Sequence, residues 1–330
     1  MIRYRHCDVA RIRRQLREPP TDRDPGDVET ASRESLVLAH EAFTLGDGDA
    51  RALAERVLYA THAYNCFAAP MQTTLAVVWA NLSRAKLRPL LVERVGEPTL
   101  TYHEMCQHLE AAVEEADRRD HGVLERLDDQ GLVLYAKNWW TSTHGFEEEL
   151  ISTLQRSSHV VRQMLFDNLS DELGGDGKPH IELRAAALRG FGVDYQPDDA
   201  GVLDHGGAFD DPDVLTEAFS VANVRTLYSL LPDPAWSLGS FYTIEAFFPA
   251  VCRRILAALR RQGTAEDDVY FWALHGEVDV EHSAEWLEGI KQAEFGDDVH
   301  ARIVNGAINH LLARSELFTA LSQRVPSRVA

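Results

Sequence analysis

Apolar residues recur at intervals of three and four positions along most of the chain, which is the pattern of a helix that buries one face. No stretch sustains the alternation of apolar and polar residues that marks a half-buried strand. We therefore predict an all-α fold. The expected helices cover residues 29–44, 49–68, 70–90, 101–119, 122–155, 158–173, 179–190, 212–231, 236–262, 265–293 and 297–323.

Start signals support several of these helices. Thr101 with Glu104 matches a capping box, in which each residue satisfies a backbone N–H group of the other. Pro70 and Pro179 suit first helical positions, where the missing N–H group has no partner to lose. Gly131 marks a point at which the helix over 122–155 could break.

The organisation of the chain follows from these patterns. Residues 19–28 are rich in proline and aspartate and carry no helical period. We expect a mobile N-terminal segment over residues 1–28, a helical extension over 29–125 packed on the core, and a helical core domain over 126–330. No polar cluster converges before about residue 125, so the extension is interpreted as packing or subunit contact.

The segment FWALHGEVDVEHSAEW, residues 271–286, interrupts an apolar helical face with His275, Asp279 and His282. On one continuous helix their offsets of four and three place the side chains on one face, within an arc of roughly 60°. No lysine or arginine lies on that face to neutralise Asp279, and an unpartnered buried carboxylate is costly. The pattern indicates a metal site.

Other charged groups interrupt apolar faces in the same way. Glu245 lies among phenylalanines in YTIEAFFP, and Glu172 and His180 flank a glycine-rich turn. Each alone has a structural alternative: a salt-bridged glutamate or a satisfied core histidine. Three imidazoles and three carboxylates together suit iron or manganese, and not calcium or a structural zinc. The run Glu147 to Glu149 is interpreted as a solvated helix face, one member of which could support the site.

Charge and cysteine content narrow the partners and the compartment. The chain has 33 basic and 52 acidic residues, and its net charge of −19 repels nucleic acid and anionic membranes. Small molecules or another protein are the expected partners. The four cysteines are widely separated, and neither a signal peptide nor a long apolar span is present, so we expect a cytoplasmic protein with free thiols.

The proposed ligands resemble those of the heme-oxygenase-like diiron oxidases. Members of that family supply a Glu, then a His after a glycine-rich turn, then a lone Glu, then the motif H-x-x-x-D-x-x-H. The positions that match are Glu172, His180, Glu245, His275, Asp279 and His282. The resemblance covers roughly residues 131–325 and leaves residues 1–125 outside.

The resemblance implies a heme-oxygenase-like helical bundle with two Fe(II) ions and O2 as co-substrate. It also implies oxidation of a small amino acid or amine in specialised-metabolite biosynthesis, by desaturation, C–N ring closure, C–C cleavage or N-oxygenation. An external electron donor and a homodimer are compatible with it. We name Lys137, Trp139 and Arg184 as residues for substrate binding, with ordinary core packing as the alternative for the tryptophan.

Two other functions stay open at this point. One is a thiaminase-like or cofactor-synthesis enzyme of the same helical fold without a diiron centre, which would take up no iron. The other is a non-catalytic helical interaction protein, in which the polar stripe at residues 271–286 would be exposed to solvent and would bind a partner.

Overall fold

The computed structural model describes residues 4, 7–9, 12, 25–65, 73–92, 94–96, 98–143, 145–175, 177–195 and 211–325. Its regular elements are α-helices, without a strand in the described residues, so the predicted all-α class is confirmed. Most of the segment 1–28, expected to be mobile, lies outside the described residues, as does Pro70. The chain divides into two compact units, Met1–Val92 and Glu93–Ala330.

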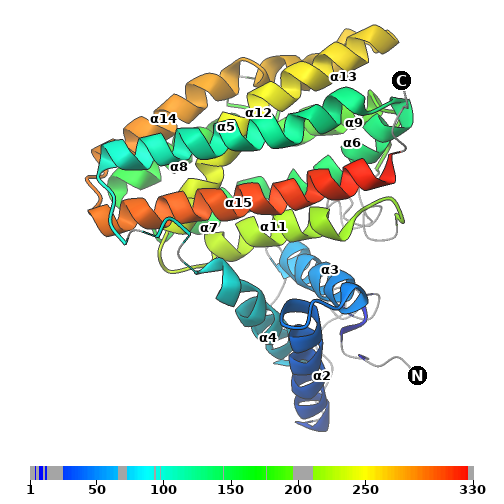
Figure 1. Ribbon diagram of the computed structural model, residues 1–330, viewed down its shortest axis with the longest axis vertical. Coiled ribbons are helices and arrows are strands. Elements are labelled where there is room, and N and C mark those ends of the chain that lie inside the picture. The colour runs from blue at the N-terminus through cyan, green and yellow to red at the C-terminus, as the bar shows by residue number, and fades with distance from the viewer. Residues whose placement is uncertain are drawn as a thin grey trace. The chain divides into compact units, whose positions relative to one another are not determined.

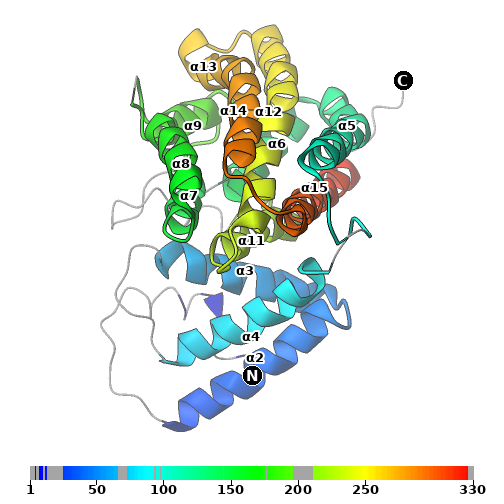
Figure 2. The ribbon, with the colours of Figure 1, turned by 90° about the vertical axis from the view of Figure 1, so that its left-hand side faces the viewer.

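The first unit is built on three helices, α2 (Pro25–Phe43), α3 (Gly48–Asn65) and α4 (Thr73–Leu90). Helix α2 packs against both of the others, and Figure 2 shows α2 and α4 side by side. Lys86 Nζ and Glu55 Oε1 form an ion pair of 2.5 Å between α4 and α3. Both side chains are buried, so two charges are held inside a small helical unit.

The second unit is a bundle of longer helices. They are α5 (Tyr102–Arg126), α6 (Asp129–Thr143), α7 (Phe146–Leu154), α8 (His159–Glu172), α9 (His180–Arg189), α11 (Thr216–Ser229), α12 (Ala235–Gln262), α13 (Glu266–His275), α14 (Val278–Gln292) and α15 (Asp297–Arg324). Helix α12 packs against α5, α13, α14 and α15, so it is the central element of the bundle (Figure 1).

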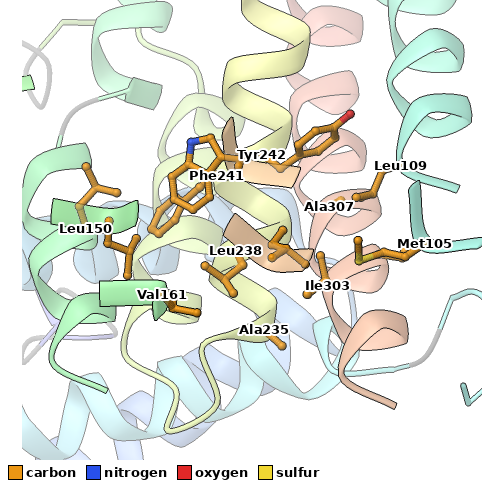
Figure 3. Packing of buried hydrophobic residues seen from close by; sticks show 14 of the residues in the cluster. Met105, Leu109, Leu150, Val161, Ala235, Leu238, Phe241, Tyr242, Ile303 and Ala307 are labelled. Carbon is orange, nitrogen blue, oxygen red and sulfur yellow. The ribbon is translucent and has the colours of Figure 1, made fainter. Parts of the chain in front are cut away.

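Helix α5 belongs to this second unit, whereas the sequence placed it in the extension that ends at residue 125. Met105 and Leu109 of α5 are buried against α12 and α15 in one apolar core (Figure 3). The same core receives Leu238 and Phe241 from α12. The division of the chain therefore falls at Val92 and Glu93, because α5 buries its apolar face in the bundle.

Local signals set some helix boundaries and failed at others. The capping box is confirmed: Thr101 Oγ1 accepts a hydrogen bond from the Glu104 N–H, and Glu104 accepts one from the Thr101 N–H. The predicted helix over 122–155 is wrong. Helix α5 ends at Arg126, and a second break lies at Gly145, whose φ of 83° favours glycine. Gly131 lies inside α6.

Close backbone packing between α12 and α15 gives the first testable prediction. A Cβ atom added to Gly239 would overlap the carbonyl oxygen of Ile303 and lie 2.8 Å from the Ala307 nitrogen. We expect Gly239→Ala to lower the free energy of unfolding by at least about 1–3 kcal/mol, as overpacked cores do. Gly122→Ala, in α5 with its nearest contact 3.5 Å away, should instead stabilise by roughly 0.4–1 kcal/mol. Urea unfolding of both variants measures the difference, and equal effects would contradict it.

The expected free thiols are confirmed for the cysteines that the structure describes. Cys7, Cys106 and Cys252 are free thiols, while Cys66 lies outside the described residues. Within the described ranges, no helix combines the length and apolar character needed to cross a membrane.

Candidate metal centre

The six predicted ligands lie in the second unit as two groups of three. In the first group, Glu245 of α12 meets Asp279 and His282 of α14, with one ligand atom from each within 4.8 Å of the others. His282 Nδ1 lies 3.6 Å from Glu245 Oε2. This group therefore offers two carboxylates and one imidazole from two packed helices.

The second group joins three helix ends. Glu172 closes α8, His180 opens α9 and His275 closes α13. His180 Nδ1 lies 3.0 Å from Glu172 Oε1, and the His180 and His275 ring centroids are 4.8 Å apart. The second group therefore offers one carboxylate and two imidazoles.

The glycine-rich turn between α8 and α9 brings Glu172 and His180 together, as the sequence predicted. Gly174 has a φ of 84°, and a Cβ atom there would lie 2.6 Å from the Pro179 nitrogen. Only glycine fits both conditions. Asp171, the neighbour of Glu172, is largely exposed and lies 3.5 Å from His282 Nε2.

The predicted single helix over 265–293 is wrong. Helix α13 ends at His275 and α14 starts at Val278, with Gly276 and Glu277 between them. His275 therefore does not share one continuous helix face with Asp279 and His282. The break lets His275 meet His180, while Asp279 and His282 meet Glu245.

Two cavities adjoin the six residues. A small cavity of about 40 Å³ is lined by Glu172, Glu245, His275 and Asp279, together with apolar and basic side chains. A larger cavity of about 1100 Å³ is lined by His180, His275 and His282. His275 borders both, so the ligand groups lie between a small cavity and a larger one.

The carboxylates of the first group are held in an unfavourable environment. Burial, followed by the negative charges of Glu245 and Glu172, raises the pKa of Asp279 well above its ordinary value. Burial also raises the pKa of Glu245. Asp279 is 2% exposed, and no described residue forms a hydrogen bond or ion pair with it. An orphaned buried carboxylate of this kind fits a metal ligand, because a cation supplies the missing positive charge.

In the second group, His275 and Glu172 are held in the forms that bind a metal. Burial and the charge of His180 lower the pKa of His275 to about 3, which keeps its ring neutral. Its Nδ1 lies 2.8 Å from the Phe271 carbonyl oxygen, which can only accept, so Nδ1 carries the proton and Nε2 is left for a ligand. Burial opposes ionisation of Glu172, but His180 outweighs it and lowers the pKa to about 2. Neutral imidazole and ionised carboxylate are the metal-binding forms. Burial lowers the pKa of His180, but the charge of Glu172 outweighs burial and raises that pKa, so a cation bound here would displace the proton of His180.

The residues present thus fit a pair of divalent cations, one beside each group. Two such ions bring a charge of +4 against −3 from the carboxylates, which removes the repulsion among Glu172, Glu245 and Asp279. Mixed imidazole and carboxylate ligands suit iron. The burial of His275 and Asp279 also disagrees with the exposed stripe expected of a non-catalytic interaction protein.

The three residues named for substrate binding have different surroundings. Lys137 pairs with Asp211 at 2.9 Å and Asp213 at 2.7 Å and borders neither of the two cavities. Trp139 lines the small cavity, and its ring centroid lies 4.6 Å from that of Trp272. Arg184 also lines the small cavity, where its guanidinium pairs with Glu147 and donates to the Thr143 carbonyl oxygen. Trp139 and Arg184 are therefore placed beside the ligands, and Lys137 is engaged elsewhere.

Sequence reasoning missed a buried ion pair beside the site. The run 147–149 is not a solvated face, because Glu149 is buried and its Oε2 lies 3.0 Å from Arg225 Nε. Burial raises the pKa of Glu149 to about 7 even beside that guanidinium. The signal was present: Glu149 shares the helical spacing of Phe146 and Leu150, which mark the buried face of α7.

A second residue missed from the sequence is Arg314 of α15, which lines the small cavity. Leu311 and Phe318 flank it at helical spacing and are both buried. A charged residue that interrupts an apolar helical face marks Glu245 in the sequence, and the same pattern at Arg314 indicates a buried cation.

A helical bundle with a buried set of imidazoles and carboxylates is an arrangement that suits a metal-dependent protein. The family model described as iron-containing redox enzyme matches residues 133–315, more than half of the chain. The chain belongs to this family of iron-containing redox enzymes, which also confirms its resemblance to the heme-oxygenase-like proteins.

Comparisons with curated proteins and with solved structures give information on the fold alone. No curated protein matches the chain. A crystal structure of a CADD-like protein of unknown function from Nostoc punctiforme is similar, with a TM-score of 0.54 and 15% sequence identity. The likeness covers 67% of this chain and 97% of that one. At this identity it shows the shared helical fold alone.

Proposed function

We propose that the protein is an O2-dependent nonheme diiron oxidase or oxygenase that acts on a small amino acid or amine in specialised-metabolite biosynthesis. The observation that carries the proposal is Asp279, a buried carboxylate that no described residue neutralises, set beside Glu245 and His282. Membership in an iron-containing redox family supports iron as the missing cation. An external electron donor and a homodimer belong to the same proposal.

The chain contributes ligand orientation and a dry environment to this chemistry. Bound iron would supply the reduction of dioxygen, which protein side chains do not perform. The Phe271 carbonyl fixes the tautomer of His275. Trp139 and Phe248 pack with Phe271 beside the small cavity, where they exclude water from the reacting bond.

Metal uptake tests the proposal. We expect the isolated protein to be nearly free of metal, and to bind close to two ferrous ions per chain when reconstituted without oxygen, because the ligands form two groups of three. Metal analysis after removal of loose iron measures the ratio. One tightly held zinc with no iron uptake would contradict the proposal, whereas weak retention of a second iron agrees with it.

The alternative is a thiaminase-like or cofactor-synthesis enzyme of the same fold without a diiron centre. It gives no reason for burying Asp279 without a cation. The same reconstitution separates the two functions, since the alternative predicts no iron uptake and no iron-dependent oxygen consumption.

A further inference from the structure

Arg314 presents a buried positive charge to the small cavity. Arg314 is 5% exposed, and its guanidinium carbon lies 5.0 Å from the centre of the Phe247 ring. In the part of the chain that the structure describes, no hydrogen bond or ion pair engages this guanidinium, and its buried Nε has no acceptor. Phe247 offers only a cation–π contact, which does not replace an anion for a desolvated charge.

The other basic residues of this cavity have carboxylate partners. Arg184 pairs with Glu147, and Arg225 pairs with Glu149. Asp120, whose charge acts on Arg314, accepts hydrogen bonds from Arg119 at 2.8 Å and Ser315 at 3.0 Å. Among the described arginines that line the cavity, Arg314 is therefore the one without a carboxylate at ion-pair distance.

The rest of the cavity wall combines apolar side chains with the predicted metal ligands. Trp139, Ile244 and Phe248 line it beside the carboxylates of Glu245 and Asp279. The buried Nε1 of Trp139 has no acceptor among the described residues, so a second donor is unused. A volume of about 40 Å³ holds a group the size of a carboxylate. The apolar part of a larger molecule must displace wall side chains or extend past His275 toward the larger cavity.

We propose that Arg314 receives the carboxylate of the substrate, so that the site selects a small carboxylic acid with an apolar side chain, such as an apolar α-amino acid. A guanidinium matches a carboxylate with two parallel hydrogen bonds, which also fix the orientation of the bound molecule. This inference rests on the proposed function and narrows its substrate class, because an amine without a carboxylate lacks the group that Arg314 needs.

The test compares Arg314→Met with the unchanged protein, using paired probes. The probes are valine, leucine, isoleucine and phenylalanine, each beside the amine that remains after decarboxylation. Calorimetric titration and the shift in melting temperature are recorded for metal-free protein and for anaerobic iron-loaded protein, and iron per chain is measured in every variant.

We expect the unchanged protein to bind at least one of the amino acids about 10- to 100-fold more tightly than its amine. This is the change in dissociation constant that a hydrogen bond to a charged group usually produces. Arg314→Met should lose this preference while iron per chain stays the same. Arg314→Lys keeps the charge but not the planar guanidinium, so it should retain part of the preference for the amino acid. It replaces Arg314→Met in the test if the Met variant does not fold.

Arg302→Met is the matched control, because Arg302 is on the same helix and pairs with Asp298 at 2.9 Å and with Asp233 at 2.6 Å near the surface. It should keep the preference for the amino acid. Binding of no amino acid by the unchanged protein, equal binding of acid and amine, or an unchanged preference in Arg314→Met would each overturn the role of Arg314.

The two proposals can fail separately. An Arg314-dependent preference in protein that takes up no iron would overturn the diiron function and leave the carboxylate site. Normal iron uptake without that preference would overturn the carboxylate site alone.

Discussion

Asp279→Asn should abolish iron-dependent oxygen consumption and lower the iron content, while the metal-free protein becomes as stable as before or more stable, by up to about 2 kcal/mol. The substitution keeps the volume and removes the charge. Because no described residue neutralises Asp279, its loss leaves no partner stranded. Half of a buried ion pair would behave in the opposite way and cost about 3–5 kcal/mol.

The stability gain should depend on pH in a defined direction. The pKa of Asp279 is raised in the folded protein, by burial and by Glu245, so its ionisation opposes folding of the metal-free chain. The protonated form of Asp279 is the one that the fold tolerates. The stability of the metal-free wild-type protein is therefore highest below the ordinary pKa of 3.8, and it falls as the pH rises toward the pKa of Asp279 in the folded protein. The advantage of Asp279→Asn should therefore increase from about pH 5 to about pH 8.

Urea unfolding of metal-free protein, measured beside iron uptake, checks both results. Glu281→Gln is the matched control, because Glu281 is an exposed carboxylate on the same helix. It should bind iron as the unchanged protein does. A large loss of metal-free stability in Asp279→Asn together with normal iron binding would refute the metal assignment of His275, Asp279 and His282.

The largest loss of stability should follow Lys86→Met in the first unit. The change removes the cation that lies 2.5 Å from Glu55 Oε1, and it leaves that carboxylate in a site where the side chain is 1% exposed. We expect the free energy of unfolding of this unit to fall by about 3–5 kcal/mol, the usual effect of removing one member of a buried pair.

The double variant Lys86→Met with Glu55→Leu tests the cause. Replacing both charges by apolar side chains of similar size removes the buried carboxylate together with its cation, and such replacements are often neutral or stabilising. Most of the lost stability should therefore return. Unfolding of the full chain is followed by hydrogen exchange of the amides in α2, α3 and α4, and a double variant as unstable as Lys86→Met would contradict this account.

The helical class and the ligand types could be determined from the sequence, because both depend on short-range patterns. Periodic apolar positions predict helices through backbone geometry alone. The capping box at Thr101 and Glu104 closes within four residues, and its hydrogen bonds are present. The glycine-rich turn places His180 beside Glu172, since Gly174 adopts a backbone conformation that favours glycine.

Tertiary structure decided which residues meet across the bundle. The break at Gly276 and Glu277 divides a pattern that reads as one helix, because His275 packs against His180 of α9 while Asp279 and His282 face α12. Local propensity does not register such competing contacts.

The partners of buried charges were likewise beyond the sequence. Glu149 reads as one of three solvated acids until Arg225 of α11 is found 3.0 Å away. Arg314 reads as one of many arginines, and only packing shows that its guanidinium lines the cavity beside Asp279 without a hydrogen bond or ion pair among the described residues. Spacing along the chain determines which face a side chain occupies. Burial and pairing depend on segments far apart in the sequence, so only the folded bundle determines them.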